Sequence, residues 1–164
     1  KETDLRQYRY PSNSEGVRGV FLGQFIPWDG YVNAERAKDH GFQFSEHPVE
    51  GCGFNYENLD NLQTGIHDYF KYLKFGFGRA TDIACNHIRR GYITRDEGRE
   101  FVWLYDGRYP STYLGKSLED ILTNICMTVD EFIVVADKFT NKAIFDERAP
   151  HQSRPKLKKH PMEI

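Results

Sequence analysis

The hydrophobic period of the chain changes near residue 57, and this change constrains the fold more than any other feature. From Leu59 to Leu73 the apolar residues recur every three or four positions, which is one face of a helix of about five turns. The Gly76-Phe77-Gly78 turn ends that helix, because its glycines interrupt the pattern. Further helical patterns follow at 81–90, from Thr94 to Leu104 or Tyr105, after Ser117 and after Thr128. The sequence therefore predicts five short helices beyond residue 57.

Capping residues support three of these helices. Thr94 with Glu97, and Thr128 with Glu131, have the spacing of a capping box, in which a hydroxyl and a carboxylate satisfy each other's free backbone N–H groups. Ser117 is the expected N-cap of the fourth helix. Inward-facing residues are expected on three of the last four helices: Ile83, Ala84, His87 and Ile88 on the helix at 81–90, Leu118, Ile121, Leu122 and Ile125 on the helix after Ser117, and Phe132, Val135, Ala136 and Phe139 on the helix after Thr128.

Before residue 57 the pattern differs. The apolar run Gly19–Ile26 lies between glycine and proline and is long enough for a buried strand but too short for a helix. A turn follows at 27–30, and Asn33 is the expected cap of a short helix from Ala34 to His40 that Gly41 ends. A strand cannot stand alone, because its backbone groups need sheet neighbours. The partners of this strand must lie within residues 1–56 or outside the chain.

These patterns divide the sequence into three parts. Residues 1–56 form the end of an α/β region with its strand at 19–26, residues 57–145 form a helical region, and residues 146–164 form a flexible tail. The tail is basic through Arg154, Lys156, Lys158 and Lys159. The predicted fold class is an α/β fragment that is mostly α, with one or a few N-terminal strands followed by about five short helices.

Charge and composition exclude several classes of protein. A net charge of −2 provides no basic field for nucleic acid, and no apolar run approaches the length of a membrane span. The three cysteines, Cys52, Cys85 and Cys126, lack disulfide or metal-site spacing and are interpreted as small buried thiols in a reducing compartment, so we expect a cytoplasmic protein. The polar start and the lack of an initiator Met indicate a fragment, a processed product or a trimmed chain.

The densest polar segment is residues 65–82. His67, Lys71 and Lys74 lie at i, i+4 and i+7 of the first helix and form one cationic stripe, with Asp68 beside it. The glycine turn then leads to a helix start that offers free N–H groups to an anion, and the Arg79 guanidinium adds a fork for phosphate or carboxylate. The structural alternative is that Gly76 and Gly78 cap one helix, Asp82 caps the next, and Arg79 pairs with Asp82.

Two other segments are weaker candidates. Trp28 and Asp29 follow the predicted strand and could hold a sugar by ring stacking and hydroxyl hydrogen bonds, or they form an ordinary turn. Glu50, with Asn55 and Glu57, offers carboxylates for proton transfer, although the same residues suit an irregular structural segment. The sequence contains no P-loop, GxGxxG, nucleophile-elbow or HExxH motif.

Nine short motifs follow one another along the chain: Tyr10-Pro11, Gly23 to Gly30, Asn33-Ala34-Glu35, Gly41-Phe42, Tyr56 to Asp60, Gly65 to Tyr69, Phe75 to Asp82, Ile88 to Gly91 and Ile93 to Glu97. In this order, they resemble the C-terminal part of the N-acetyl sugar amidotransferases of bacterial surface-polysaccharide synthesis. The resemblance extends from about Tyr8 to Phe139, and its most specific part is the run that ends at Asp82. The sequence departs from the family's pattern at Ile83 and Gly98, where His and Ala are usual.

This resemblance implies a PP-loop, Rossmann-like enzyme that uses ATP and Mg to activate the acetamido oxygen of a nucleotide-linked sugar. Ammonia from a separate glutaminase subunit then displaces that oxygen and gives an acetamidino group, in lipopolysaccharide and O-antigen synthesis. The phosphate loop of the family and its zinc ribbon are absent from this sequence. The chain would therefore be the second half of the enzyme and inactive alone, with the ATP site mostly outside it.

The resemblance favours the functional interpretation of residues 76–82. Arg79 is expected to clamp an anion, Lys71 and Lys74 to support its charge, and Asp82 to orient it, while Trp28 and Asp29 contact the sugar. The predicted substrate and nucleotide site also includes His67, Asp68, Gly76, Gly78 and Thr81. The alternative function is a non-catalytic helical interaction module. A more distant one is an RNA-modifying relative, which the net charge disfavours. Apolar surface exposed by an absent half would favour a homo-oligomer.

Overall fold

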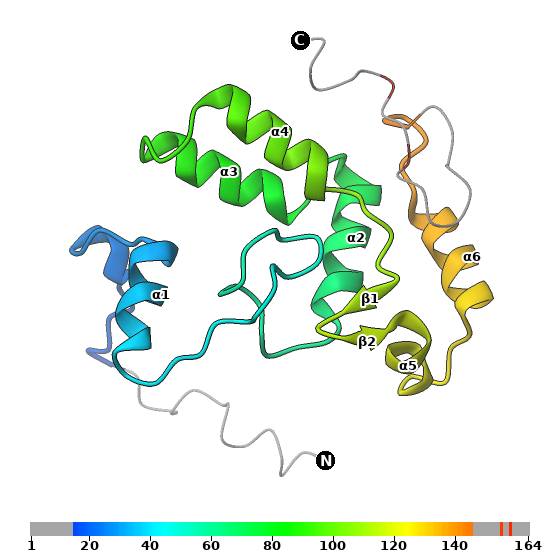
Figure 1. Cartoon of the computed structure of the whole chain (residues 1–164), viewed down its shortest axis with the longest axis horizontal. Coiled ribbons are helices and arrows are strands. Elements are labelled where there is room, and N and C mark those ends of the chain that lie inside the picture. Colours follow the sequence, from blue (N-terminus) through cyan, green and yellow to red (C-terminus); the bar gives the residue numbers. More distant parts are fainter. Residues whose placement is uncertain (1–14, 146–154, 156–157, 159–164) are drawn as a thin grey trace. The chain divides into compact units, whose positions relative to one another are not determined.

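The computed structural model describes residues 15–145 together with Pro155 and Lys158. The chain divides into two compact units, Lys1–Gly41 and Phe42–Ile164. The described residues contain a 3₁₀ turn, six α-helices and a two-stranded antiparallel sheet, so the predicted class of a mostly α fragment is confirmed. The elements are η2 Leu22–Gln24, α1 Gly30–Lys38, α2 Thr64–Phe75, α3 Arg79–Arg89, α4 Arg95–Tyr105, β1 Thr112–Tyr113, β2 Lys116–Ser117, α5 Leu118–Thr123 and α6 Val129–Phe139 (Figure 1).

The first unit lacks the strand predicted at 19–26. The chain instead closes the 3₁₀ turn η2, in which the Gln24 amide donates to the Phe21 carbonyl and the Ile26 amide to the Leu22 carbonyl, both at 3.0 Å. The apolar side chains stay outside, and Phe21 is 82% exposed. A strand needs neighbouring strands to pair its backbone groups, and none is present among the described residues of this unit. The backbone groups therefore pair locally, within the 3₁₀ turn.

Helix α1 begins at Gly30, four residues earlier than predicted. Its N-cap is Asp29 and not Asn33, because one Asp29 carboxylate oxygen accepts hydrogen bonds from the amides of Tyr31 at 2.9 Å and Val32 at 3.2 Å. An aspartate in extended backbone conformation satisfies helix-start amides as well as asparagine does. The sequence offered both residues, and the earlier one serves as the cap.

In the second unit, α2 joins two hydrophobic clusters. One cluster packs Tyr69 and Leu73 of α2 against buried residues of α5 and α6, namely Leu118, Leu122, Phe132, Ile133 and Ala136. The other combines Val49, Cys52, Ile83, Tyr113 and Ile121, with Ile66 of α2 packed against it. Helix α2 therefore positions both the α5–α6 side of the unit and the segment before it.

The predicted helix starts are confirmed where a local cap defines them. Thr94 with Glu97 and Thr128 with Glu131 form complete capping boxes, and the Ser117 hydroxyl accepts from the Asp120 amide. The same hydrogen bonds hold the pKa of Glu97 and Glu131 below the ordinary glutamate value.

Other predicted boundaries and orientations are wrong. Helix α2 begins at Thr64 and not near 57, because residues 57–63 form an irregular turn in which Asn58 has a φ of 55°. Ile125 and Phe139, predicted to face inward, are exposed. On α6, Ile133 is buried although it was not among the residues predicted to face inward. Of the three cysteines expected to be buried, Cys52 is, while Cys85 and Cys126 are exposed.

Two features of the second unit were not predicted from the sequence. Helices α3 and α4 pack side by side, and the hairpin β1–β2 follows α4 through a turn at Leu114 and Gly115, both with positive φ (Figure 1). Two-residue strands are too short to show an alternating pattern. The Tyr113 hydroxyl donates to the Asn58 carbonyl at 3.2 Å, so the hairpin is tied to the segment before α2.

The predicted flexible tail is anchored at its two described residues. The Pro155 side chain is buried, and its carbonyl accepts a hydrogen bond from the Tyr72 hydroxyl at 3.4 Å. The Lys158 amide donates to the Ile144 carbonyl at 2.8 Å. The basic residues Arg154, Lys156 and Lys159 lie outside the described residues. Among the described helices, none combines the length and the apolar character that crossing a membrane would require.

Leu73 tests the α2 core, since its side chain is 0% exposed and lies in the larger cluster. We expect Leu73→Ala to lower the free energy of unfolding by about 2–5 kcal/mol, because it removes buried methyl groups and leaves a cavity. Val134→Ala on α6, where the side chain is 68% exposed, is the control and should change stability by less than about 0.5 kcal/mol. Urea unfolding followed by circular dichroism measures both, and equal effects would contradict the assigned core.

Candidate functional site

A cavity of about 390 Å³ lies within the second unit. Four segments line it: residues 48–51, helix α2 through Gly65, Asp68 and Tyr69, the start of α3 through Gly78 and Arg79, and residues 105–113, which run from the end of α4 through the connecting loop to β1. Its volume is in the range of small-molecule sites, and it combines aromatic walls with a few charged groups. We therefore take it as the candidate site.

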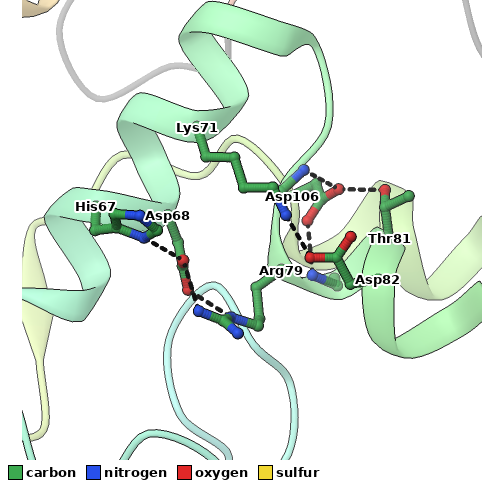
Figure 2. A network of polar contacts seen from close by, with 9 residues as sticks. His67, Asp68, Lys71, Arg79, Thr81, Asp82 and Asp106 are labelled. Carbon is green, nitrogen blue, oxygen red and sulfur yellow. Dashed lines mark hydrogen bonds and ion pairs between the residues drawn. The ribbon is translucent and has the colours of Figure 1, made fainter. Parts of the chain in front are cut away.

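An ion pair between Asp68 and Arg79 lies at the centre of the cavity wall. The Arg79 guanidinium donates through Nε to Oδ2 and through Nη2 to Oδ1 of Asp68, both at 3.1 Å (Figure 2). The Asp68 side chain is 7% exposed. Pairing with Asp68 outweighs the opposing effect of burial and raises the pKa of Arg79. The His67 ring, 71% exposed, places Nδ1 3.0 Å from Asp68 Oδ1, so one carboxylate contacts both the Arg79 and the His67 side chains.

The predicted cationic stripe of His67, Lys71 and Lys74 does not converge on one ligand. The Lys71 ammonium makes a short ion pair with Asp82 (Figure 2). It also lies 4.8 Å from the centre of the Phe77 ring. The Lys74 ammonium lies 4.7 Å from the centre of the Phe139 ring. The pairing of Arg79 with Asp82 in the structural alternative is also wrong, because Asp82 pairs with Lys71 and Arg79 with Asp68.

The start of α3 is occupied by a carboxylate from the chain itself. Asp106, from the end of α4, accepts hydrogen bonds from the Gly78 amide at 2.8 Å, the Ala80 amide at 2.9 Å and the Thr81 hydroxyl at 2.5 Å (Figure 2). A Cβ on Gly78 would lie 2.6 Å from an Asp106 oxygen, so glycine is required there. The sequence predicted free amides for an anionic ligand at this helix start, but the Gly78 and Ala80 amides donate to Asp106.

The remaining predicted site residues fall into two groups. Gly76 has a φ of 79° and ends α2, as the structural alternative proposed. Trp28 and Asp29 belong to the first unit, where Trp28 is exposed and Asp29 caps α1. Their contact with a sugar stays a prediction.

Most of the cavity residues were not among the predicted site residues. The most polar of them, Asp106, Arg108 and Tyr109, come from the segment between α4 and β1. Loops on a rigid scaffold often carry function, but nothing in the local sequence pattern pointed to the long-range contacts of this segment. Glu50, which the sequence offered as a weaker candidate, accepts from the Thr112 hydroxyl at 3.1 Å and the Leu114 amide at 3.2 Å.

The described residues do not fit the ATP and Mg that the resemblance implies. The helix start that could have received a phosphate holds Asp106. In the described part of the chain, no three His, Cys, Asp or Glu side chains are grouped to hold a metal ion. Burial raises the pKa of Cys52 to about 12, so this thiol stays protonated and is a core residue.

Asp106→Ala tests the internal cap. Removing the carboxylate leaves two buried amides and a hydroxyl without their acceptor, so we expect a loss of about 1–3 kcal/mol in the free energy of unfolding. Asp60→Ala, at an exposed loop position, is the control with the same charge change. Chemical denaturation measures both, and a result in which the two variants are equally stable would contradict the cap.

A second prediction concerns the pH dependence of this group. Burial raises the pKa of Asp106 above its ordinary 3.8, although its hydrogen bonds act in the opposite direction. A carboxyl that binds its proton more tightly when folded stabilises the fold fully below pH 3.8, and this contribution is lost as the pH rises through the raised pKa. The destabilisation caused by Asp106→Asn should therefore be larger in acid than at neutral pH, as measured by urea unfolding. A larger effect at neutral pH would contradict the raised pKa.

No curated protein matches the chain. The family model described as "LPS biosynthesis protein WbpG-like, C-terminal domain" matches residues 36–158. That range includes every residue of the cavity and all the helices of the second unit. The match confirms the lipopolysaccharide-related resemblance inferred from the motifs, and the chain belongs to the family of WbpG-like lipopolysaccharide biosynthesis proteins through their C-terminal domain.

Proposed function

We propose that the chain is the C-terminal part of an ATP-dependent N-acetyl sugar amidotransferase and that its cavity binds the nucleotide-linked acetamido sugar. Two kinds of support are independent of each other: the lipopolysaccharide family of the chain and the chemistry of the cavity. The PP-loop assignment, the ATP dependence and the cytoplasmic location belong to the same proposal. So do a glutaminase partner and assembly as a homo-oligomer.

The observation that carries the proposal is the Asp68–Arg79 pair on the cavity wall. Asp68 uses Nε and Nη2 of the guanidinium, and within the described part of the chain Nη1 is left for a ligand. Tyr69, Tyr105, Tyr109 and Tyr113 line the same cavity. Aromatic faces suit sugar rings, and a fixed guanidinium suits a phosphate or a carboxylate.

The role of these residues is binding and orientation. In the proposed reaction the acetamido carbon forms a bond to the nitrogen of ammonia and loses its bond to the activated oxygen. The activation with ATP takes place on groups outside the described residues, because Asp106 occupies the start of α3, where the ATP phosphates could have bound. Within the cavity, Arg79 would hold the substrate so that the acetamido group faces the activating site. A fixed orientation of this kind lowers the entropic part of the barrier.

One observation favours a second function, a non-catalytic interaction module. In the first unit, Val17, Val20, Phe21, Leu22, Phe25 and Ile26 are all exposed. Contiguous exposed apolar side chains often mark protein contacts. An enzyme part and an interaction module differ in one measurable property, which is saturable binding of a sugar nucleotide by the chain.

Calorimetric titration of the chain with UDP-N-acetylglucosamine and with ATP tests the proposed function. We expect saturable binding of the sugar nucleotide and weaker binding of ATP, because the tyrosine side chains that line the cavity offer aromatic faces to a sugar ring. Arg79→Ala should weaken sugar-nucleotide binding about 10- to 100-fold, as expected for a lost charge-assisted hydrogen bond.

Arg89→Ala at the other end of α3 is the matched control, since Arg89 bonds only to Asn86 among the described residues. Binding should be unchanged in that variant. If Arg79→Ala leaves the affinity for both nucleotides at the wild-type value, the clamp is wrong. If the wild-type chain binds no sugar nucleotide, the interaction module is favoured.

A further inference from the structure

Arg108 is a cation on the cavity wall that the proposed function has not used. Its side chain is exposed, and its guanidinium carbon lies 5.5 Å from the centre of the Tyr105 ring. Tyr105 is itself packed against Phe101, with 4.9 Å between the ring centres. The guanidinium therefore rests on a supported aromatic face, which limits its conformational freedom without neutralising its charge.

The backbone that carries Arg108 is held in place by its neighbours. Asp106, two residues before it, is fixed by hydrogen bonds to the start of α3. Gly107 has a φ of 72°, and a Cβ there would lie 2.4 Å from a ring carbon of Tyr72. Pro110, two residues after it, is buried. A side chain presented by so constrained a loop is preorganised for a ligand.

The other charged groups of the cavity wall already have partners. Asp68 is bound by Arg79, Asp106 by the amides of α3, and Glu50 by Thr112 and Leu114. Among the described residues, Arg108 makes no ion pair with a carboxylate. An incoming anion would therefore pair with Arg108 without breaking an existing ion pair, whereas full use of Arg79 would compete with Asp68.

We infer that Arg108 binds the diphosphate of a nucleoside-diphosphate sugar in this cavity. This inference rests on the proposed function, because it assigns the phosphates of the same substrate. A planar guanidinium can donate two parallel hydrogen bonds to phosphate oxygens, which an ammonium does not match. Arg79, already engaged by Asp68, is then the secondary contact, and Arg108 sets the preference for the diphosphate.

A titration series that varies only the phosphate tests the inference. The whole chain is titrated with uridine, UMP, UDP and UDP-N-acetylglucosamine. We expect affinity to rise from uridine to UDP and to fall as salt is added, since the contact is exposed. Arg108→Ala should weaken UDP and UDP-N-acetylglucosamine binding about 10- to 100-fold and leave uridine unchanged. Arg108→Lys should restore only part of the affinity, because the bidentate contact is lost.

Arg95→Ala is the matched control, since Arg95 is an exposed arginine of the same unit that does not line the cavity. Thermal melting of each variant separates lost binding from lost folding. Arg108-dependent binding of UDP that gains nothing from the sugar would support this inference and contradict the proposed substrate. Sugar-nucleotide binding that is equal in wild type and Arg108→Ala would overturn this inference and leave the proposed function intact. If the wild type binds no member of the series, both are wrong.

Discussion

The buried carboxylate of Asp106 is the interaction on which the second unit most depends. It joins the end of α4 to the start of α3, and the bond from the Gly78 amide spans 28 residues of sequence. It also accepts from the amide of Ala80, which no side chain of the α2–α3 turn caps. A helix start carries a partial positive charge and unpaired donors, so a carboxylate placed there is stabilised. Burial opposes this and raises the pKa of Asp106. The close approach of Asp106 to the start of α3 explains the glycine at residue 78, and the close approach of the Tyr72 ring explains the glycine at residue 107.

The internal cap also determines where a ligand can bind. A helix start with a glycine turn is a common anion site, but here the amides are already used. The position of the cap fixes the loop that follows α4 and directs Tyr105, Arg108 and Tyr109 to the cavity. The Asp106 carboxylate therefore occupies the amides at the start of α3 and, at the same time, positions the side chains of the proposed ligand site in the cavity. The binding proposed for this chain therefore rests on side chains of the segment after α4 and not on the amides of a helix start.

Sequence patterns predicted the parts of this fold that local chemistry determines. Caps at Thr94, Ser117 and Thr128 need only residues three positions away, and all three were correct. The strand at 19–26 failed because a strand depends on neighbours that a local pattern cannot supply. At the site, the sequence pattern singled out residues 65–82 as the densest polar segment, and the ion pairs within this segment differ from the one that the structural alternative proposed. Arg79 pairs with Asp68 and Lys71 with Asp82, so both pairs join α2 to α3, and such contacts between helices depend on tertiary packing that a local pattern does not show.

The Asp68–Arg79 pair explains why two arginines are needed in one cavity. A buried carboxylate is destabilising unless it is paired. If Arg79 left Asp68 for a ligand, the unpaired Asp68 carboxylate would lower the stability of the fold. It can add a ligand through its remaining nitrogen, but it stays largely neutralised. A substrate with two negative phosphates then requires a second cation whose charge is not already used. Arg108 meets this requirement because it rests on an aromatic ring, which orients a guanidinium while leaving its N–H groups available.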